Sequence, residues 1–430
     1  MTLLVVSPDY ASHLLPLLQI ARRWLGTRGE VVVATGPATR HLVEAAGVAW
    51  TDLRLGRGRN AGVIEVADQP AGEDAHLQAF FDATRAGPIA TLTYQADARR
   101  HDLLYDPDGV LDRLGEIVRD VRPEWVVVDH VAFGARLALH ALGVPAVSVV
   151  LGHPSALPAP GEVYGLPSAW PAAITPDPTE LETLRRRCRE SVDELAAAAA
   201  EVLARRAPGR PPIGDLTSRP SPDGLPTVYA SPLALHDPAR ALPPRSVFVG
   251  SLARAESIGE TVLPAGDGPL VLVALGSFLG ARDDVLATAV RAANQAGWRL
   301  AIATGSTPVE RLGALPPGAL VARHLPQVAL LGHADVFVNH GGNGSVTEAA
   351  AAGVPQVVLP FSTDQFALAA AVESVGVGSA LSPNGLTVEQ LVASVTSALA
   401  PSVRRRAGEL AEEVASSGGA AAAVAAIAAG

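Results

Sequence analysis

The sequence predicts an α/β protein with two Rossmann-like domains, each a doubly wound parallel sheet with helices around it. Three observations lead to this fold class. The chain has 430 residues, more than one compact domain usually holds. Short apolar runs alternate with amphipathic segments, as strands and helices do in a parallel α/β sheet. The same alternation starts again in the second half, which indicates two successive units.

In the first half, apolar runs are expected to form strands at 3–6, 31–34, 125–128 and 146–150. Amphipathic helices are expected between them, at 14–25, 39–46, 111–118 and 132–142. Frequent glycine and charge predict a mobile surface loop over 53–72, and a proline-rich stretch covers 154–178. A long helix with a polar face is expected at 179–206.

In the second half, strands are expected at 270–275, 299–304, 336–339 and 356–360. They are preceded by a connector rich in proline, glycine and arginine, by a strand at 227–230 and by an apolar run at 246–250. The predicted first domain therefore covers 1–240, with the connector at about 207–245. The predicted second domain covers 246–430, and its last helix could return to the first domain.

Composition restricts the class of partner and the compartment. Hydrophobic residues make up 48% of the chain and charged residues 18%, so a large core is expected and general disorder is not. The net charge of −10 argues against a nucleic-acid partner. Cys188 is the single cysteine and cannot form an internal disulfide, which fits a reducing compartment. We therefore expect a cytoplasmic monomer or homodimer.

No targeting or membrane segment is expected either. The first residues lack the basic leader and cleavage site of a signal peptide. The apolar tail at 420–429 is about half as long as a membrane-crossing helix needs to be.

The sequence indicates no cofactor and no metal site. Residues 56–61 match the pattern G-x-G-x-x-A, but they follow no clear strand and are crowded with arginine, so a surface loop is the better interpretation. The histidines are scattered, and neither a cysteine pair nor an H-x-x-x-H helix is present.

The segment that follows the expected strand at 336–339 has the features of an anion site. His340 ends the strand, and the glycine-rich run 341–345 opens a helix that extends to Ala352. Glycine lets the backbone approach an anion, and a helix start offers unpaired N–H groups with a partial positive charge. Asn343, Ser345 and His340 could add side-chain donors. Alternatively, the glycines form only a tight turn, with Asn343 or Ser345 as the helix cap.

This segment resembles the donor signature of the UDP-glycosyltransferase family, which includes plant small-molecule enzymes and bacterial macrolide and antibiotic glycosyltransferases. The resemblance rests on His340-Gly341-Gly342-Asn343-Gly344-Ser345, Glu348, Gly353-Val354-Pro355, Pro360, Asp364-Gln365 and, upstream, Leu325-Pro326-Gln327 and Leu331. It implies the GT-B fold, in which two Rossmann-like domains face each other across a cleft and a C-terminal helix follows. The first domain would bind the acceptor and the second the nucleotide sugar.

The resemblance also implies donor-binding roles. His340 and Ser345, with the backbone of Gly342, Asn343 and Gly344, would hold the diphosphate, and Ser277 would meet it from the other side. Glu348 would accept the ribose hydroxyls, Gln327 and His324 would lie against the base, and Asp364 and Gln365 would contact the sugar. Plant members have tryptophan where His324 stands. After the Asp-Gln pair, Phe366-Ala367-Leu368 replaces the usual asparagine-containing continuation, so the identity of the sugar stays open.

An attacking hydroxyl needs a base, and His13 is the candidate. It lies where the first strand gives way to a helix, with Pro16 expected in the first helical turn. A helix N-terminus disfavours the imidazolium, so a neutral ring is expected near pH 7. Alternatively, His13 only caps or packs. The resemblance implies the role of base through the family pattern Gly-His-x-x-Pro, with Ser12 here in place of the glycine.

Asp129 is the expected partner of His13. It ends the strand expected at 125–128, and strand carboxyl ends converge on one crevice in open α/β sheets. The family places an aspartate there, which would orient the ring and stabilise the imidazolium. Asp129 could instead cap the helix from Val131, and the two roles can coexist. His130 and His153 are weaker candidates for the base.

Three functions are compatible with these features. The first is an inverting glycosyltransferase that moves a sugar from a UDP- or dTDP-sugar to the hydroxyl of a small molecule, as in antibiotic and other natural-product biosynthesis. The second is an NDP-sugar 2-epimerase of the same fold, and the third is a catalytically silent auxiliary homologue. Acceptor contacts are expected from loops at 53–72, 80–93 and 153–170, including His153 and Trp170. The last two segments are apolar with a few polar groups, which suits a hydrophobic secondary metabolite.

Overall fold

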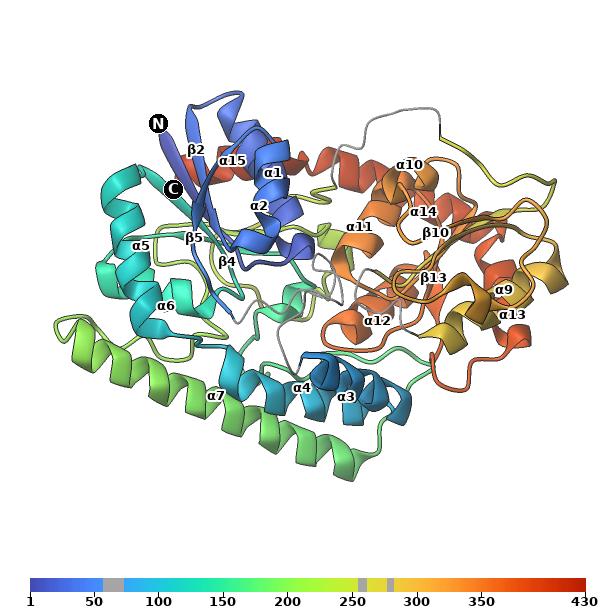
Figure 1. Ribbon diagram of the computed structural model, residues 1–430, viewed down its shortest axis with the longest axis horizontal. Coiled ribbons are helices and arrows are strands. Elements are labelled where there is room, and N and C mark those ends of the chain that lie inside the picture. The colour runs from blue at the N-terminus through green and yellow to red at the C-terminus, as the bar shows by residue number, and fades with distance from the viewer. Residues whose placement is uncertain (57–72, 254–260, 277–281) are drawn as a thin grey trace.

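A computed structural model of the chain describes residues 1–56, 73–253, 261–276 and 282–430. Within these residues, two parallel sheets lie next to each other, and helices flank both of them (Figure 1). The predicted fold class is therefore confirmed. Ser277 and most of the loop expected at 53–72 lie outside the described residues.

The first sheet has seven strands in the order β3-β2-β1-β4-β5-β6-β7, and each neighbouring pair is parallel. Its strands are β1 (Thr2–Val6), β2 (Glu30–Thr35), β3 (Ala49–Asp52), β4 (Trp125–Asp129), β5 (Val147–Val150), β6 (Thr227–Tyr229) and β7 (Ser246–Phe248). The central strands are continuous apolar runs because helices cover both of their faces. β7 pairs with β6, so the first sheet extends beyond the predicted boundary at 246, and the chain passes to the second sheet between Phe248 and Leu270. The sequence of a three-residue edge strand does not indicate which of the two sheets the strand joins.

The second sheet has six parallel strands in the order β10-β9-β8-β11-β12-β13. They are β8 (Leu270–Ala274), β9 (Arg299–Ala303), β10 (Leu320–Ala322), β11 (Val336–Asn339), β12 (Gln356–Val358) and β13 (Gly378–Ala380). In both sheets the strand order reverses next to the first strand of the unit, β1 or β8. Ligands of open α/β sheets bind outside the strand ends at such a reversal, which directs attention to the residues after β1, β4, β8 and β11.

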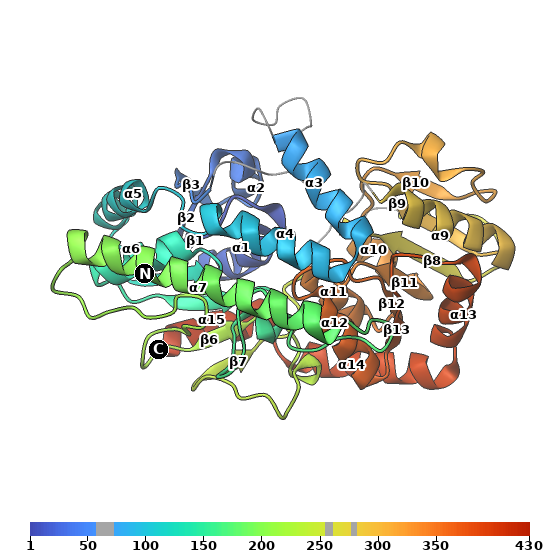
Figure 2. The same cartoon turned by 90° about the horizontal axis from the view of Figure 1, so that it is seen from below.

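The helices connect the strands and cover the sheets. In the first half they are α1 (Ala11–Leu25), α2 (Arg40–Ala45), α3 (Glu73–Ala86), α4 (Pro88–Asp102), α5 (Pro107–Val121), α6 (Phe133–Leu142) and α7 (Pro178–Arg206). In the second half they are α9 (Asp283–Ala296), α10 (Gln327–Leu331), α11 (Asn343–Ala352), α12 (Gln365–Val375), α13 (Val388–Ala398), α14 (Pro401–Ser416) and α15 (Gly419–Ala429). α4 packs along α7, and α3 extends from this pair towards the second sheet (Figure 2).

The segment at 80–93, expected to be a loop, is helical. α3 and α4 meet at Gly87, whose φ of +132° is a conformation that side chains rarely adopt. Phe80 and Phe81 on α3 are buried in the core beneath the second sheet, although their segment precedes β4 of the first sheet in sequence. This docking could not be predicted from the sequence, because the two aromatic rings could equally have packed on their own sheet.

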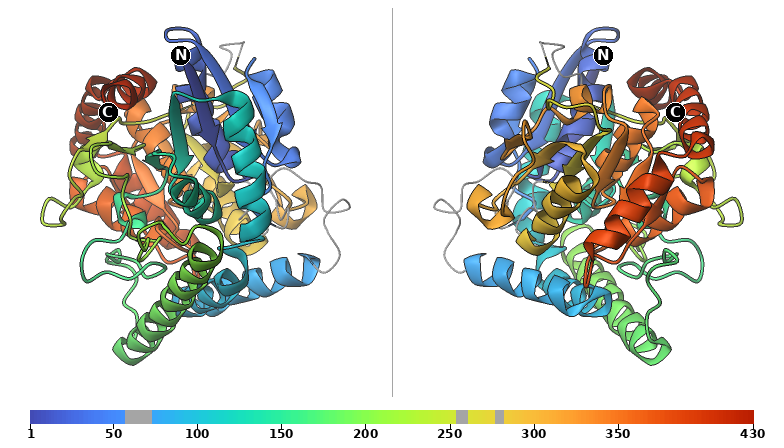
Figure 3. Two further views of the ribbon diagram at one scale, coloured as in Figure 1. Left: turned by 90° about the vertical axis from the view of Figure 1, so that its left-hand side faces the viewer. Right: turned by 90° about the vertical axis from the view of Figure 1, so that its right-hand side faces the viewer.

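The C-terminal helices connect the two units. α14 packs on α11 of the second unit, whereas α15 packs on α1 of the first. As a result, both chain termini lie at the same end of the molecule (Figures 1 and 3). Among the described residues, one helical stretch, Pro401–Ala429, is both long enough and apolar enough to cross a membrane. The stretch is broken at Gly418, whose φ is +79°, and Ala423, Val424 and Ile427 are buried in the core beside α1.

Candidate active site

The two candidates for base catalysis are in direct contact. His13 is the third residue of α1, and Asp129 is the last residue of β4, the neighbour of β1. His13 Nδ1 lies 2.7 Å from Asp129 Oδ2. The other carboxylate oxygen, Oδ1, accepts the backbone N–H of Val131 at 3.0 Å. Separate oxygens therefore serve the two roles that the sequence left open for Asp129.

The contact between His13 and Asp129 shifts the pKa values of the two side chains in opposite directions. Burial disfavours the imidazolium of His13, but the charge and hydrogen bond of Asp129 outweigh burial and raise the pKa of His13 above its ordinary value. Burial also disfavours the Asp129 carboxylate, yet His13 and His130 hold its pKa well below the usual range. Because Nδ1 of His13 faces Asp129, Nε2 is the nitrogen left to accept a proton.

Two expectations about this helix need correction. α1 begins at Ala11, so Pro16 is its sixth residue and not part of its first turn. The missing N–H of Pro16 leaves the carbonyl of Ser12 without its helical partner, and Ser12 is exposed, so water can take that place. The helix N-terminus was also expected to keep the pKa of His13 low. The opposite shift prevails because a carboxylate at 2.7 Å acts more strongly than a partial helix charge.

Sequence reasoning missed a buried cation behind the pair. Arg136 on α6 is 7% exposed, and its guanidinium donates to the carbonyls of His130 and Leu216 at 2.8 and 2.9 Å. His130 is 2% exposed, with Nδ1 3.3 Å from Asp129 Oδ1, so its ring is buried beside the carboxylate. No pattern in the sequence distinguishes a buried arginine from the exposed ones.

The glycine-rich run forms the turn between β11 and α11. Asn339 Oδ1 accepts the N–H of Gly341 at 2.8 Å, which tightens the turn. Gly342 is the N-cap residue, and no side chain caps the helix. The N–H groups of the first helical turn, from Asn343 to Ser345, therefore have no side-chain partner at the cap and point out of the helix end. This is the arrangement that binds anions.

His340 is held between two glycines. A Cβ at Gly342 would lie 2.4 Å from Nε2 of His340, and one at Gly276, after β8, would lie 2.8 Å from its Cε1. Burial lowers the pKa of His340 to about 4, against the opposing influence of the Asp364 carboxylate and the Ala274 carbonyl. The ring is therefore neutral at pH 7 and can donate one hydrogen bond without carrying a charge.

Three of the residues expected to bind the sugar donor, Gln327, Ser345 and Glu348, form one cluster at α11. Gln327, the first residue of α10, donates through Nε2 to Glu348 Oε2 at 2.6 Å and to Ser345 Oγ at 3.4 Å. His324 lies on the exposed turn between β10 and α10. Ser277, the remaining expected phosphate contact, is outside the described residues.

The Asp-Gln pair lies at the start of α12, in a strained turn. Thr363 has a φ of +52°, a region that β-branched residues rarely enter and that often marks a functional site. Asp364 Oδ2 accepts the backbone N–H of His153 at 2.7 Å. Gln365 Oε1 accepts the N–H groups of Phe361 and Ser362, which leaves its amide nitrogen as the group for other contacts.

The two residues expected to bind the acceptor are partly used inside the protein. His153 is 4% exposed; Nδ1 bonds to Ser155 Oγ at 2.8 Å and Nε2 to the carbonyl of Leu235 at 3.1 Å. Burial lowers the pKa of His153 to about 4, and with both nitrogens engaged the ring is not available as a base. Trp170 is half-buried and packs against Phe366 of α12, with ring centroids 4.7 Å apart.

These groups converge on one place between the two sheets. The negative charge of Asp364, on the second unit, acts to raise the pKa of His13, His153 and His340. For His153 and His340, burial outweighs this effect. Such influence requires proximity, so the base candidate and the glycine-rich turn share one site. Across the described part of the chain, no group of three or more His, Cys, Asp or Glu side chains is placed to hold a metal ion.

Comparison with known proteins agrees with this architecture. Residues 298–429 match the family of the erythromycin biosynthesis protein CIII-like C-terminal domain. The chain is 26% identical over 328 residues to the NDP-glycosyltransferase YjiC of Bacillus subtilis, covering 76% of this chain and 77% of that protein. It is 36% identical over 178 residues to the oleandomycin glycosyltransferase of Streptomyces antibioticus, covering 40% of this chain and 41% of that protein.

A solved structure resembles the whole chain. The glycosyltransferase of kitacinnamycin superposes with a TM-score of 0.70 at 25% identity, covering 99% of this chain and 97% of that one. The donor signature predicted from the sequence thus lies within a matched family domain, and both sheets match a glycosyltransferase. The chain is therefore a glycosyltransferase with the GT-B fold, and it is similar to antibiotic glycosyltransferases.

Proposed function

We propose that the chain is an inverting glycosyltransferase that moves a sugar from a nucleoside diphosphate to a hydroxyl of a hydrophobic small molecule. The observation that carries this proposal is the 2.7 Å contact between His13 and Asp129, placed across the site from the uncapped start of α11. One end of the site can take a proton, and the other can take a negative leaving group.

The reaction is a single displacement. The acceptor oxygen attacks the anomeric carbon while its proton passes to Nε2 of His13, and Asp129 stabilises the resulting imidazolium. The bond between the anomeric carbon and the diphosphate oxygen breaks on the opposite face. Both electrons of that bond leave with the diphosphate, which the N–H groups of the α11 start and neutral His340 stabilise. Attack opposite to the leaving group inverts the anomeric configuration.

The donor would lie along the second unit. Glu348 and Gln327, joined at 2.6 Å, suit the ribose and base, and Asp364 with the amide nitrogen of Gln365 suits the sugar hydroxyls. A hydrophobic acceptor suits the half-buried ring of Trp170, which packs against the fully buried ring of Phe366. We further propose that the protein acts in the cytoplasm, as a monomer or a homodimer.

Product analysis tests the proposal. The protein is incubated with UDP-glucose or dTDP-glucose and a panel of hydrophobic phenols and alcohols, and proton NMR follows the anomeric signals. We expect free nucleoside diphosphate together with a glycoside of inverted configuration. A 2-epimer of the donor without acceptor would show an epimerase, and neither product would indicate an auxiliary homologue; either result would contradict the proposal.

We further propose that transfer requires no metal ion, because neutral N–H donors at a helix start can stabilise the diphosphate. Turnover should be the same in EDTA as in magnesium or manganese. A rate abolished by EDTA and restored by either ion would show that a cation is needed.

A further inference from the structure

Asn343 connects the glycine-rich turn to the opposite sheet. It is the first residue of α11, and its Nδ2 donates to the carbonyls of Leu151 and Ala230 at 2.9 and 2.8 Å. Leu151 directly follows β5 and Ala230 directly follows β6 in the first sheet. The first side chain of α11, the helix at which the diphosphate is expected, is thus hydrogen-bonded to the first sheet.

The amide of Asn343 has no further donor for a ligand. A carboxamide carries two N–H groups, and the two carbonyls take both of them. Its Oδ1 is buried and has no hydrogen-bond partner in the described structure, and as an acceptor it would repel a phosphate. The expectation from sequence that this side chain donates to the diphosphate therefore fits the geometry poorly. Its backbone N–H, at the uncapped helix start, remains available.

A third hydrogen bond joins the units at the same place. Asp364 Oδ2 accepts the N–H of His153, and Gly152 makes the approach possible because a Cβ there would lie 2.5 Å from that oxygen. All the groups contributed by the first unit are backbone atoms that follow strands β5 and β6. β5 pairs with β4, whose last residue is Asp129, the partner of His13. The path from the leaving-group helix to the base is therefore two neighbouring strands of one sheet.

We propose that Asn343 is a positioning residue, which holds the leaving-group helix at a set place relative to His13 through the ends of β5 and β6. This inference rests on the proposed function and adds to it a role outside ligand binding. Its consequence is a division of effects: without Asn343, the second unit binds the nucleotide as before, whereas the reacting groups are no longer held in register. Misplaced reacting groups slow the chemical step even when both substrates are bound.

The test compares Asn343→Ala with Asn294→Ala. Asn294 on α9 also donates through Nδ2 to two backbone carbonyls, those of Val290 and Ala314, at 3.1 and 2.7 Å, but within one unit. The control therefore removes the same chemical group and the same number of hydrogen bonds without touching the junction. For each protein, calorimetry measures UDP and dTDP affinity, solution scattering measures the ligand-free radius of gyration, and initial rates give kcat and KM.

For Asn343→Ala we expect a kcat roughly tenfold or more below the parent, since two hydrogen bonds are lost. The nucleotide affinity should change by less than about twofold, a difference of under half a kcal/mol. The radius of gyration should increase, because the units separate more readily. Asn294→Ala should match the parent in affinity, radius and kcat. Gly152→Ala, which attacks the junction from the first unit, should reproduce the increase in radius with nucleotide affinity preserved.

A loss of nucleotide affinity in Asn343→Ala, with an unchanged radius of gyration, would overturn the inference and make Asn343 a phosphate ligand. Unchanged kcat and radius in both junction variants would overturn it as well. If Asn343→Ala fails to fold, Gly152→Ala decides alone by the same readouts. Failure of the proposed function is distinct: the parent would then form no glycoside, while the ligand-free scattering comparison would still decide whether Asn343 holds the units together.

Discussion

Two histidines on opposite sides of one site have opposite acid–base properties. His13, on the first unit, has a raised pKa because the Asp129 carboxylate outweighs the effect of burial. His340, on the second unit, has a pKa lowered to about 4 because burial prevails over weaker opposing groups. His13 is 2.7 Å from a buried carboxylate, whereas His340 is packed against the backbone of two glycines. The difference shows that the partner of the ring, and not the residue type, determines which histidine can accept a proton.

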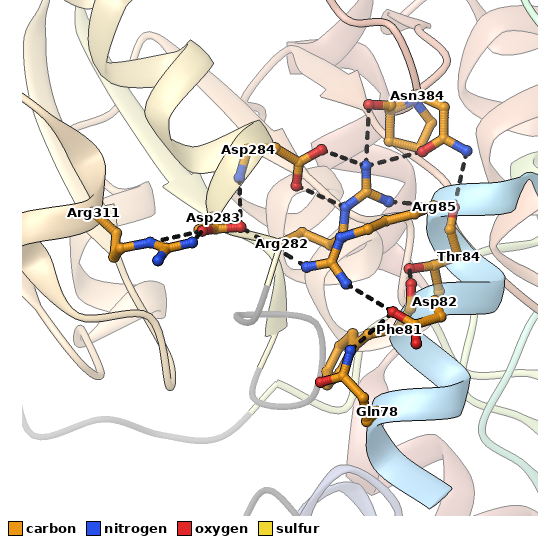
Figure 4. A network of polar contacts seen from close by, with 11 residues as sticks. Gln78, Phe81, Asp82, Thr84, Arg85, Arg282, Asp283, Asp284, Arg311 and Asn384 are labelled. Carbon is orange, nitrogen blue, oxygen red and sulfur yellow. Dashed lines mark hydrogen bonds and ion pairs between the residues drawn. The ribbon is translucent and has the colours of Figure 1, made fainter. Parts of the chain in front are cut away.

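The two environments also differ in what holds them. The two residues of the His13 pair both belong to the first unit, in which Arg136 and His130 are also buried. The surroundings of His340 come from three segments: the turn after β8 and the turn after β11 contact its ring, and Asp364 influences its pKa. A second polar contact joins the two units at α3 (Figure 4). There, Arg282 is 1% exposed, binds Asp284 through two nitrogens at 2.8 and 2.7 Å and reaches Asn384, whose amide donates to the Thr84 carbonyl of α3 at 2.8 Å.

The largest expected effect is on the proton-accepting side. His13→Ala should lower turnover by roughly 10²–10⁴-fold, the usual contribution of a general base. Nucleotide affinity should hardly change, because we propose that the nucleotide binds on the second unit. Steady-state rates and calorimetry on the same preparation check both statements, and His41→Ala, an exposed histidine on α2, is the control. Near-normal turnover on ordinary alcohols would show that the base lies elsewhere.

The same prediction has an internal check. Asp129→Asn should cost less, or as much if the ring adopts the wrong tautomer, and the double variant should be no worse than His13→Ala alone. An acceptor with an unusually acidic hydroxyl should partly restore turnover to His13→Ala. Additive losses would mean that the two residues act separately.

The next largest effect is expected on the second unit, where we propose that the leaving group binds. His340→Ala should weaken nucleoside diphosphate binding by about 1.5–3 kcal/mol, the value of a hydrogen bond to a charged group. Calorimetry with UDP and dTDP measures the loss. If His340 serves only to pack between the glycines, both affinities will equal those of the parent.

A smaller effect should follow from crowding His340 instead of removing it. Gly342 has a φ of −66°, which alanine adopts readily, so Gly342→Ala introduces only a methyl group 2.4 Å from the ring. Displacement of the ring should weaken nucleotide binding about three- to tenfold, or about 0.7–1.4 kcal/mol, which is near the lower end of what overpacking commonly costs. Gly408→Ala on α14, where a Cβ meets nothing within 4 Å, should leave the affinity unchanged. Equal affinities in both variants would refute the proposed packing of His340.

The smallest effect needs no substitution and concerns pH. Only neutral His13 can accept a proton, so kcat should rise with pH through the raised pKa of His13 and then level off. His340 should stay neutral throughout this range and protonate only towards pH 4. Side-chain NMR of the two rings distinguishes these titrations. The comparison fails if His340 takes up its proton at a higher pH than His13.

The sequence predicted the strands well and the helices unevenly. β11 was expected at 336–339 and is found there, because a buried four-residue apolar run between helices has few alternatives. α3 and α4 were missed because their helical signal is weak and the sequence does not reveal which sheet covers Phe80 and Phe81. The start of α1 was expected three residues late, which moved Pro16 into the wrong turn.

What the sequence determined by itself is the chemistry available at the strand ends. The glycines after β11, the histidine after β1 and the aspartate at the end of β4 were all evident, since local geometry requires these residue types in a parallel α/β unit. The tertiary structure alone decided the state of these groups. The pKa of His13, the buried position of Arg136 and the attachment of Asn343 to Leu151 and Ala230 depend on atoms from distant segments. Charge and hydrogen bonding act through space, so they are set only when the two sheets are in place.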